Sequence, residues 1–246
     1  MNRALAYTIL GGVLFVFFAL AALPARLVFD AAAGPAGLRA GLVQGSVWDA
    51  QILRLSAGGP PITEIRAGLR PAGLLAGAAR FDVSVRDATL RGEGVLALRP
   101  SGAALEAFTG VAALSRFPLI AGLPEGQSVQ VDIERLAVDA QGRCREADGT
   151  VRTGALAAAG EPFGAALPVL EGGLLCAGEA IAVQLDGRSE AIELSGRIRF
   201  EPDGPSWRVS ARTRDRDVVA ALSVIGFLQT GPGAFELDSQ RLEEEE

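Results

Sequence analysis

The most uniform apolar stretch of the chain is a run of twenty residues from Ala4 to Leu23 (ALAYTILGGVLFVFFALAAL), which contains no charged side chain. A helix rises ~1.5 Å per residue, so this run would span roughly 30 Å, the thickness of a bilayer core. Arg3, just before the run, favours a cytoplasmic N-terminus. We therefore expect a single-pass anchor over residues 1–25 and the bulk of the chain outside the cytoplasm. The apolar side chains expected to contact lipid are Leu5, Ile9, Leu10, Val13, Leu14, Phe15, Phe17, Phe18, Leu20 and Leu23.

Two other interpretations of this run remain open. A cleaved signal peptide usually has an apolar core of ~7–15 residues, which is shorter than this one. Small residues at Ala19, Ala21 and Ala25 could nevertheless serve a signal peptidase. A buried core helix seldom needs so long an apolar run. The length therefore favours a retained anchor.

Farther along, apolar and polar residues alternate, as in residues 81–86 (FDVSVR). A period of two is typical of a strand with one wet face. The phase of the alternation shifts near Asp87, at residues 134–135 and at residues 186–187, and each shift requires a turn or a bulge. The pattern thus predicts a series of antiparallel strands in which each strand follows its neighbour in the sequence.

The expected fold is mainly β: an N-terminal transmembrane helix, then a twisted, antiparallel, meander-like sheet with one or two short helices. We expect an anchor over residues 1–25 and one β-rich domain over 26–246, which could contain two sub-sheets that meet near 100–127. The individual elements expected are strands over 47–55, 62–70 and 231–237, turns at the Asp-Gly pairs 148–149, 186–187 and 203–204, an irregular tether over 26–40, a turn over 71–77, and helices over 103–115 and 217–228, the second capped by Asp217.

Composition excludes several chemistries. The chain has no histidine and no lysine, so it lacks a histidine general base, a histidine metal ligand and a lysine Schiff base. The acidic residues are scattered and mostly sit beside arginines or in Asp-Gly pairs, which is typical of a solvated face. The net charge of −6 offers no general basic field for nucleic acid. We therefore expect a protein that is not an enzyme, with no cofactor and no metal.

Cys144 and Cys176 are the only cysteines. Outside the cytoplasm an oxidising compartment would permit a disulfide between them, and we expect one. The alternative is two small buried residues that never meet.

Several features follow one another in an order that resembles a known family. The anchor precedes GSVW (residues 45–48), RAGLRPAGLL (66–75), LRGEG (90–94) and the Leu-Pro joint at 123–124, and a β-rich second half ends in a helix and a strand. This order resembles the type II secretion system protein N family of Gram-negative bacteria. The resemblance implies an inner-membrane protein with a periplasmic β-rich domain and an accessory role in the secretion apparatus. It also implies a fold similar to the AsmA-like group, in which some sheets carry lipid in a groove.

These features are compatible with three functions. The first is a structural or assembly role through contacts with other inner-membrane components and, as a further candidate, the outer-membrane secretin. The second is lipid binding in an apolar groove between sheet and helix, and the third, least supported, is a carboxylate-based hydrolase. Trp48 and Trp207 can each anchor either a core or an interface, and a core position is the expectation for both.

Overall fold

The computed structural model describes residues 11–12, 18, 22–33, 37–56, 60–75, 77–116, 126–201 and 204–239. Within these residues no helix is both long and apolar enough to cross a membrane. Of the side chains expected to contact lipid, Phe18 and Leu23 are described and the other eight lie outside the described residues. The anchor therefore stays a prediction.

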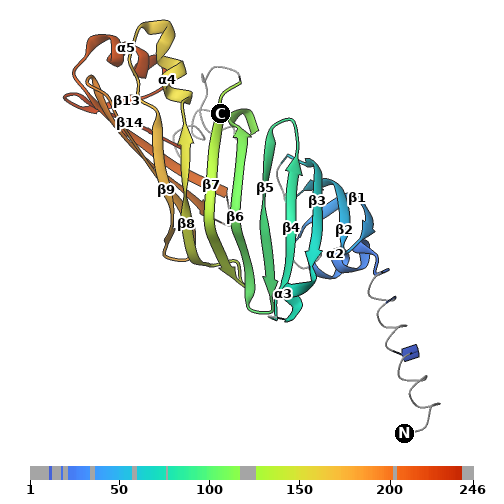
Figure 1. Ribbon diagram of the computed structural model, residues 1–246. Helices are drawn as coiled ribbons and strands as arrows, with labels where there is room; N and C mark the ends of the chain where they lie inside the picture. Colours follow the sequence, from blue (N-terminus) through green and yellow to red (C-terminus); the bar gives the residue numbers. More distant parts are fainter. Residues whose placement is uncertain are drawn as a thin grey trace. The chain divides into compact units, whose positions relative to one another are not determined.

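The described chain forms two compact units, which divide between Ala88 and Thr89. The division falls ahead of residues 100–127, where the sequence suggested a join between sub-sheets. Both units are antiparallel meanders with a few short helices, which confirms the mainly β fold (Figure 1).

In the first unit, neighbouring strands pair in sequence order from β1 to β4. Its elements are α2 (Ala25–Ala33), β1 (Arg39–Ser46), β2 (Asp49–Ser56), β3 (Ile62–Arg70), α3 (Pro71–Leu75) and β4 (Ala79–Arg86). One face of this sheet carries apolar side chains such as Ile52, Ile65 and Val85, which lie directly opposite one another on β2, β3 and β4.

In the second unit, strands also pair with their sequence neighbours, except that β14 lies between β12 and β13. Its elements are β5 (Leu90–Arg99), β6 (Gly102–Ala113), η1 (Leu114–Arg116), β7 (Ser128–Asp139), β8 (Cys144–Thr153), α4 (Ala155–Gly160), η2 (Glu161–Phe163), β9 (Leu170–Ala177), β10 (Ala180–Arg188), β11 (Ile192–Glu201), β12 (Gly204–Thr213), α5 (Arg216–Ile225), β13 (Leu228–Gly231) and β14 (Ala234–Asp238).

The hydrophobic core of the second unit lies between the apolar face of its later strands and the helices α4 and α5. These two helices lie together near one end of the strands (Figure 1). Val218, Leu222 and Ile225 lie on one face of α5 and are all buried, and Leu222 is 0% exposed. Trp207 of β12 packs in the same cluster at 6% exposure.

The expected helix over 103–115 is wrong, because residues 103–113 belong to strand β6, paired with both β5 and β7, and only the short η1 follows. Ala107 has a φ of 48° and forms a bulge against β5, where the register shifts between Glu93 and Val95. The extra residue leaves Leu105 and Phe108 on the same face. Their separation of three residues imitates a helix in the sequence.

The tether expected over 26–40 is also wrong at its start, where α2 forms. The segment is rich in alanine, the best helix former, and Arg26 and Asp30 form an i,i+4 ion pair of 3.6 Å.

Two of the expected Asp-Gly turns lie inside strands instead. Gly149 is in β8 with a φ of 159°, opposite the β7 bulge at Glu134. Gly187 is in β10, where an added Cβ would come within 2.7 Å of Leu170, so close packing explains this glycine. The third Asp-Gly pair, at residues 203–204, is consistent with the expected turn, since β11 and β12 pair with each other as far as Glu201 and Gly204.

Candidate interaction surfaces

Among the described residues, no group of three acidic or cysteine side chains comes together in a way that could hold a metal ion. The candidate sites of the described chain are surfaces, a strand edge and a disulfide.

The apolar face of β5, β6 and β7 is one such surface. Leu96 pairs with Leu105, which in turn pairs with Leu136 on β7, and all three side chains are half-buried. The buried members of the core cluster begin at Val151 of β8, so this part of the face is less covered than the part near α4 and α5. It forms an apolar strip that is still partly open to solvent.

Phe108 is seated on this face by three glycines. A Cβ added at Gly92 would come within 2.5 Å of the Phe108 ring, and one added at Gly94 or Gly110 would come within 2.8 Å of Phe108. Only residues without a side chain leave room for the ring to lie against the strands. The LRGEG stretch of the sequence thus has a packing role.

The outer edge of β1, a strand that α2 also contacts, is a second feature. Among the described residues, β1 is paired along its length with β2 alone, and at its end Pro24 forms a bridge with Ser46. Leu42, near the middle of β1, is 47% exposed. An edge strand presents unpaired backbone groups to which another chain can add a strand. No charged residue follows Arg39 within β1, so the strand lacks a common defence against such pairing.

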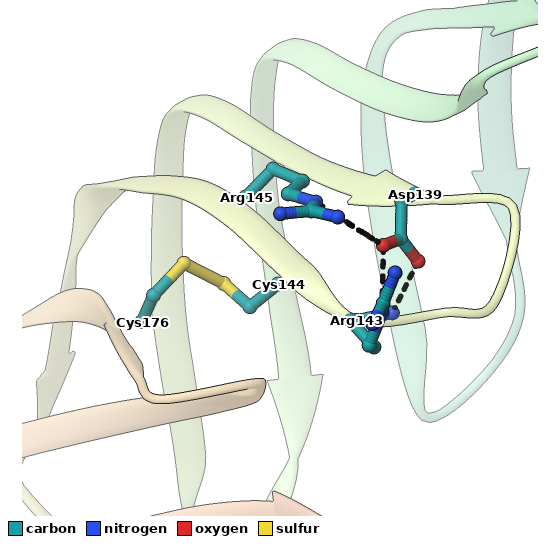
Figure 2. The surroundings of a disulfide bond; sticks show 5 residues. All are labelled: Asp139, Arg143, Cys144, Arg145 and Cys176. Atoms are coloured by element: carbon teal, nitrogen blue, oxygen red, sulfur yellow. Dashed lines mark hydrogen bonds and ion pairs between the residues drawn. A yellow bond between two sulfur atoms is a disulfide. The ribbon is translucent and has the colours of Figure 1, made fainter.

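A disulfide joins Cys144 and Cys176, as the sequence predicted, with a Cα–Cα distance of 5.6 Å (Figure 2). The β8–β9 ladder covers Thr150–Thr153 and Leu170–Gly173 and stops there. Beyond the ladder, β8 and the β9–β10 hairpin are held by this disulfide and by a 2.7 Å hydrogen bond that the Cys144 N–H donates to the Glu179 carbonyl. The disulfide therefore joins β8 to the β9–β10 hairpin beyond the point where the β8–β9 ladder ends.

Asp139 organises the β7–β8 turn beside the disulfide (Figure 2). Its Oδ1 accepts hydrogen bonds from the backbone N–H groups of Gln141 and Arg143, at 2.9 and 3.0 Å. Its Oδ2 lies 2.8 Å from Arg143 Nε and 2.7 Å from Arg145 Nη2. Desolvation raises the Asp139 pKa, but these backbone and guanidinium hydrogen bonds outweigh it and lower the pKa to about 2. Arg143 also reaches Glu179 at 3.3 Å and so links two neighbouring hairpins.

The two tryptophans lie in different surroundings. Trp207 is in the core of the second unit, whereas Trp48 is half-buried in the turn that joins β1 and β2. The backbone around Trp48 is packed against β3, because the Leu69 N–H donates to the Val47 carbonyl at 3.0 Å. The GSVW stretch therefore forms a fixed hairpin turn next to the exposed edge strand.

Sequence reasoning missed the open edge of β1 and the end of the β8–β9 ladder. Strand order and register decide both features, and neither is visible in a local pattern. The lack of charge between residues 40 and 46 was the one available signal for the edge.

The model of the family described as type II secretion system (T2SS), protein N, matches residues 36–238, which is more than half of the chain. The chain matches none of the curated proteins and none of the solved structures. The matched range includes every strand of both units. On this evidence the chain belongs to the type II secretion system protein N family.

Proposed function

We propose that this protein is a non-enzymatic component of the type II secretion apparatus that acts in its assembly through protein–protein contacts. The run from Ala4 to Leu23 would anchor it in the inner membrane with a cytoplasmic N-terminus, and residues 26–246 would lie in the periplasm. Its partners would be other inner-membrane components of the apparatus and the outer-membrane secretin. The disulfide supports a periplasmic location, because disulfides persist in oxidising compartments.

The observation that carries the proposed mode of action is the outer edge of β1, which has no charged residue from Ala40 to Ser46 and, among the described residues, no second strand paired along it. A partner segment that added a strand there would gain backbone hydrogen bonds and cover the exposed part of Leu42. Trp48, in the adjoining turn, would lie beside the added strand and could extend the contact.

The test is a charge placed on this edge. Leu42→Lys should prevent strand addition, because an edge lysine would have to be desolvated by an incoming strand. Val111→Lys is the matched control, since Val111 is similarly exposed, at 44%, but lies on β6, which is paired on both sides. Both variants should keep the wild-type melting temperature.

The measurement is co-purification of secretion components with the tagged full chain from detergent-solubilised membranes. We expect Leu42→Lys to lose the partners and to reduce secretion, and Val111→Lys to retain both. Partners that remain bound to Leu42→Lys would exclude β1 as the contact edge.

The anchor is tested separately. The mature protein should begin at Met1 or Asn2 and should resist carbonate extraction, because a twenty-residue apolar run is long enough to stay in the bilayer. An N-terminus found just after Ala21 or Ala25 would show a cleaved signal peptide instead.

A second candidate function is lipid binding, and the partly open apolar strip on β5–β7 favours it. Acyl chains could lie along Leu96, Leu105 and Leu136, which present no polar group to them. Mass spectrometry of lipids extracted from the purified protein tests this. Leu105→Asn should reduce bound lipid, whereas Val111→Asn, on the opposite face of the same strand, should not; equal lipid content in both would exclude the strip as the lipid site.

A further inference from the structure

We propose that the wet face of β10, β11, β12 and β14 contains a binding site for a phosphate group, centred on Arg197. The site is independent of the β1 edge and of the apolar face. Its evidence is a pocket, a cross-strand pair of like charges and the hydroxyl groups around them.

The pocket has a volume of about 470 Å³ and lies entirely within the second unit. Its lining includes the arginines Arg197, Arg199 and Arg208, together with Gln184, Ser195, Ser206, Ser210, Asp238 and Ser239. Three guanidinium groups face one carboxylate in this lining, so the pocket favours an anion.

Arg197 and Arg208 occupy directly opposite positions on β11 and β12. Like charges in such a cross-strand pair destabilise a sheet. On its other side Arg197 is opposite Gln184 of β10, so no carboxylate faces it directly from either neighbouring strand. Ser195 and Arg199 are its nearest neighbours on the same face of β11.

Two other arginines of the second unit lie directly opposite carboxylates. Arg152 pairs in register with Glu171 at 3.2 Å, and Arg188 pairs in register with Glu193 at 2.9 Å. The Arg197–Arg208 pair departs from this arrangement. An anion between the two guanidinium groups would remove the repulsion and would explain the departure.

The three arginines of the pocket differ in how far they are already neutralised. Arg208 Nε lies 2.8 Å from Glu236, and Arg199 lies 3.6 Å from Glu201. Arg197 forms no ion pair or hydrogen bond with any residue that the structure describes. Its five N–H donors are therefore free for a ligand.

A phosphate group fits this set of donors. A guanidinium binds two phosphate oxygens in a bidentate manner, and a second guanidinium across the strand pair can hold the third. Ser195 and Ser210 lie directly opposite each other, one step along the same face, and can donate hydroxyl hydrogen bonds. The phosphate could be free or could belong to a lipid headgroup.

The test uses the full chain in a detergent without phosphate. Binding of radiolabelled inorganic phosphate and of short-chain dihexanoyl phosphatidic acid is measured by equilibrium dialysis. Binding of inorganic phosphate assigns the site to a free phosphate group, and binding of phosphatidic acid alone assigns it to a lipid headgroup. Binding of neither overturns the proposal.

Two variants locate the site. Arg197→Gln should weaken binding about tenfold or more, the usual effect of losing a hydrogen bond to a charged group. Arg197→Lys should bind with an intermediate affinity, because it keeps the charge and loses the bidentate geometry. Arg152→Gln, an exposed arginine on β8, is the control and should bind as the wild type does. Equal binding by Arg197→Gln and the wild type would overturn the proposal.

A structural role for Arg197 predicts a different result in the absence of ligand. If Arg197 is kept for binding, the unliganded Arg197→Gln variant should melt at or above the wild-type temperature, because a like-charge pair has been removed. A marked fall in the melting temperature of that variant would show that Arg197 stabilises the fold and would count against the site.

Discussion

Replacing both Cys144 and Cys176 with serine should remove the constraint that closes the second unit where the β8–β9 ladder ends. The two residues are 32 positions apart, and the chain-entropy relation then gives a loss of about 3.7 kcal/mol at 25 °C. For a protein of this size, such a loss lowers the melting temperature by roughly 7–15 °C. Urea or thermal unfolding followed by circular dichroism measures the change.

The structure also predicts where the sheet should loosen first. The ladder holds β8 and β9 together over Thr150–Thr153. Nearer Cys144, β8 is still paired with β7, but its attachment to the β9–β10 hairpin depends on the disulfide and on the hydrogen bond to Glu179. Amide hydrogen exchange should therefore increase at residues 144–149 and 174–177 in the double-serine variant, before it increases at 150–153. Strands β11 and β12, paired over ten positions, should change least.

Reduced wild-type protein is the control, because it keeps both side chains and loses the bond alone. It should melt at the temperature of the double-serine variant and show the same exchange pattern. A melting temperature unchanged by either treatment, or an exchange increase spread evenly over the second unit, would refute the reasoning from the interrupted ladder. Cys144→Ser alone should leave Cys176 open to thiol reagents in the native protein.

Further predictions concern single residues. Asp139→Asn should destabilise the protein at neutral pH, because the hydrogen bonds that lower the Asp139 pKa to about 2 favour the folded state. The wild type should therefore have the larger free energy of unfolding above pH ~4, and the difference should disappear as the pH falls towards 2. Gly92→Ala should cost ~1–3 kcal/mol in a chemical unfolding experiment, because the new Cβ would overlap the Phe108 ring, whereas Gly154→Ala, with open space around it, should be tolerated. Asp215→Ala should cost ~1 kcal/mol in the same assay, because Asp215 accepts from two N–H groups at the start of α5.

The wet and dry faces of the sheet were predictable because strand alternation is local. In residues 81–86 the side chains with even numbers are polar, and this alone indicates a strand that is wet on one side. The shift of phase at residues 134–135 required a turn or a bulge, and the structure has a bulge at Glu134. The sequence could not decide between the two, because both leave the same pattern of residues.

Two predictions, the helix over 103–115 and the N-cap at Asp217, failed because tertiary contacts decide these positions. β6 is rich in Ala and Gly, and its low intrinsic strand propensity is overridden by pairing with β5 and β7 on both sides. The N-cap of α5 is Asp215 and not Asp217, since the helix begins at Arg216 and the Asp215 carboxylate accepts from the N–H groups of Asp217 and Val218. Both aspartates suit a cap, and the strand that precedes the helix selects the first.

The candidate surfaces were harder to predict than the fold. The disulfide could be predicted from two cysteines and an inferred compartment. The Arg197–Arg208 pair could not, because it depends on the register between β11 and β12. A shift of one residue would place Arg197 opposite Val209 or Trp207, which belong to the other face.

The distribution of burial connects these features to function. The helices α4 and α5 cover the main core cluster of the second unit, and the buried members of that cluster begin at Val151 of β8. Leu96, Leu105 and Leu136 continue the same apolar face but remain half-buried. Apolar area that stays in contact with water forgoes about 25 cal/mol per Å² of stabilisation, so a monomer gains nothing from leaving it open. The open part of this face and the free edge of β1 are both explained if the protein's stability in the cell is completed by a bound partner or lipid. A protein purified without its partner should accordingly be less stable than the same protein within the assembled apparatus.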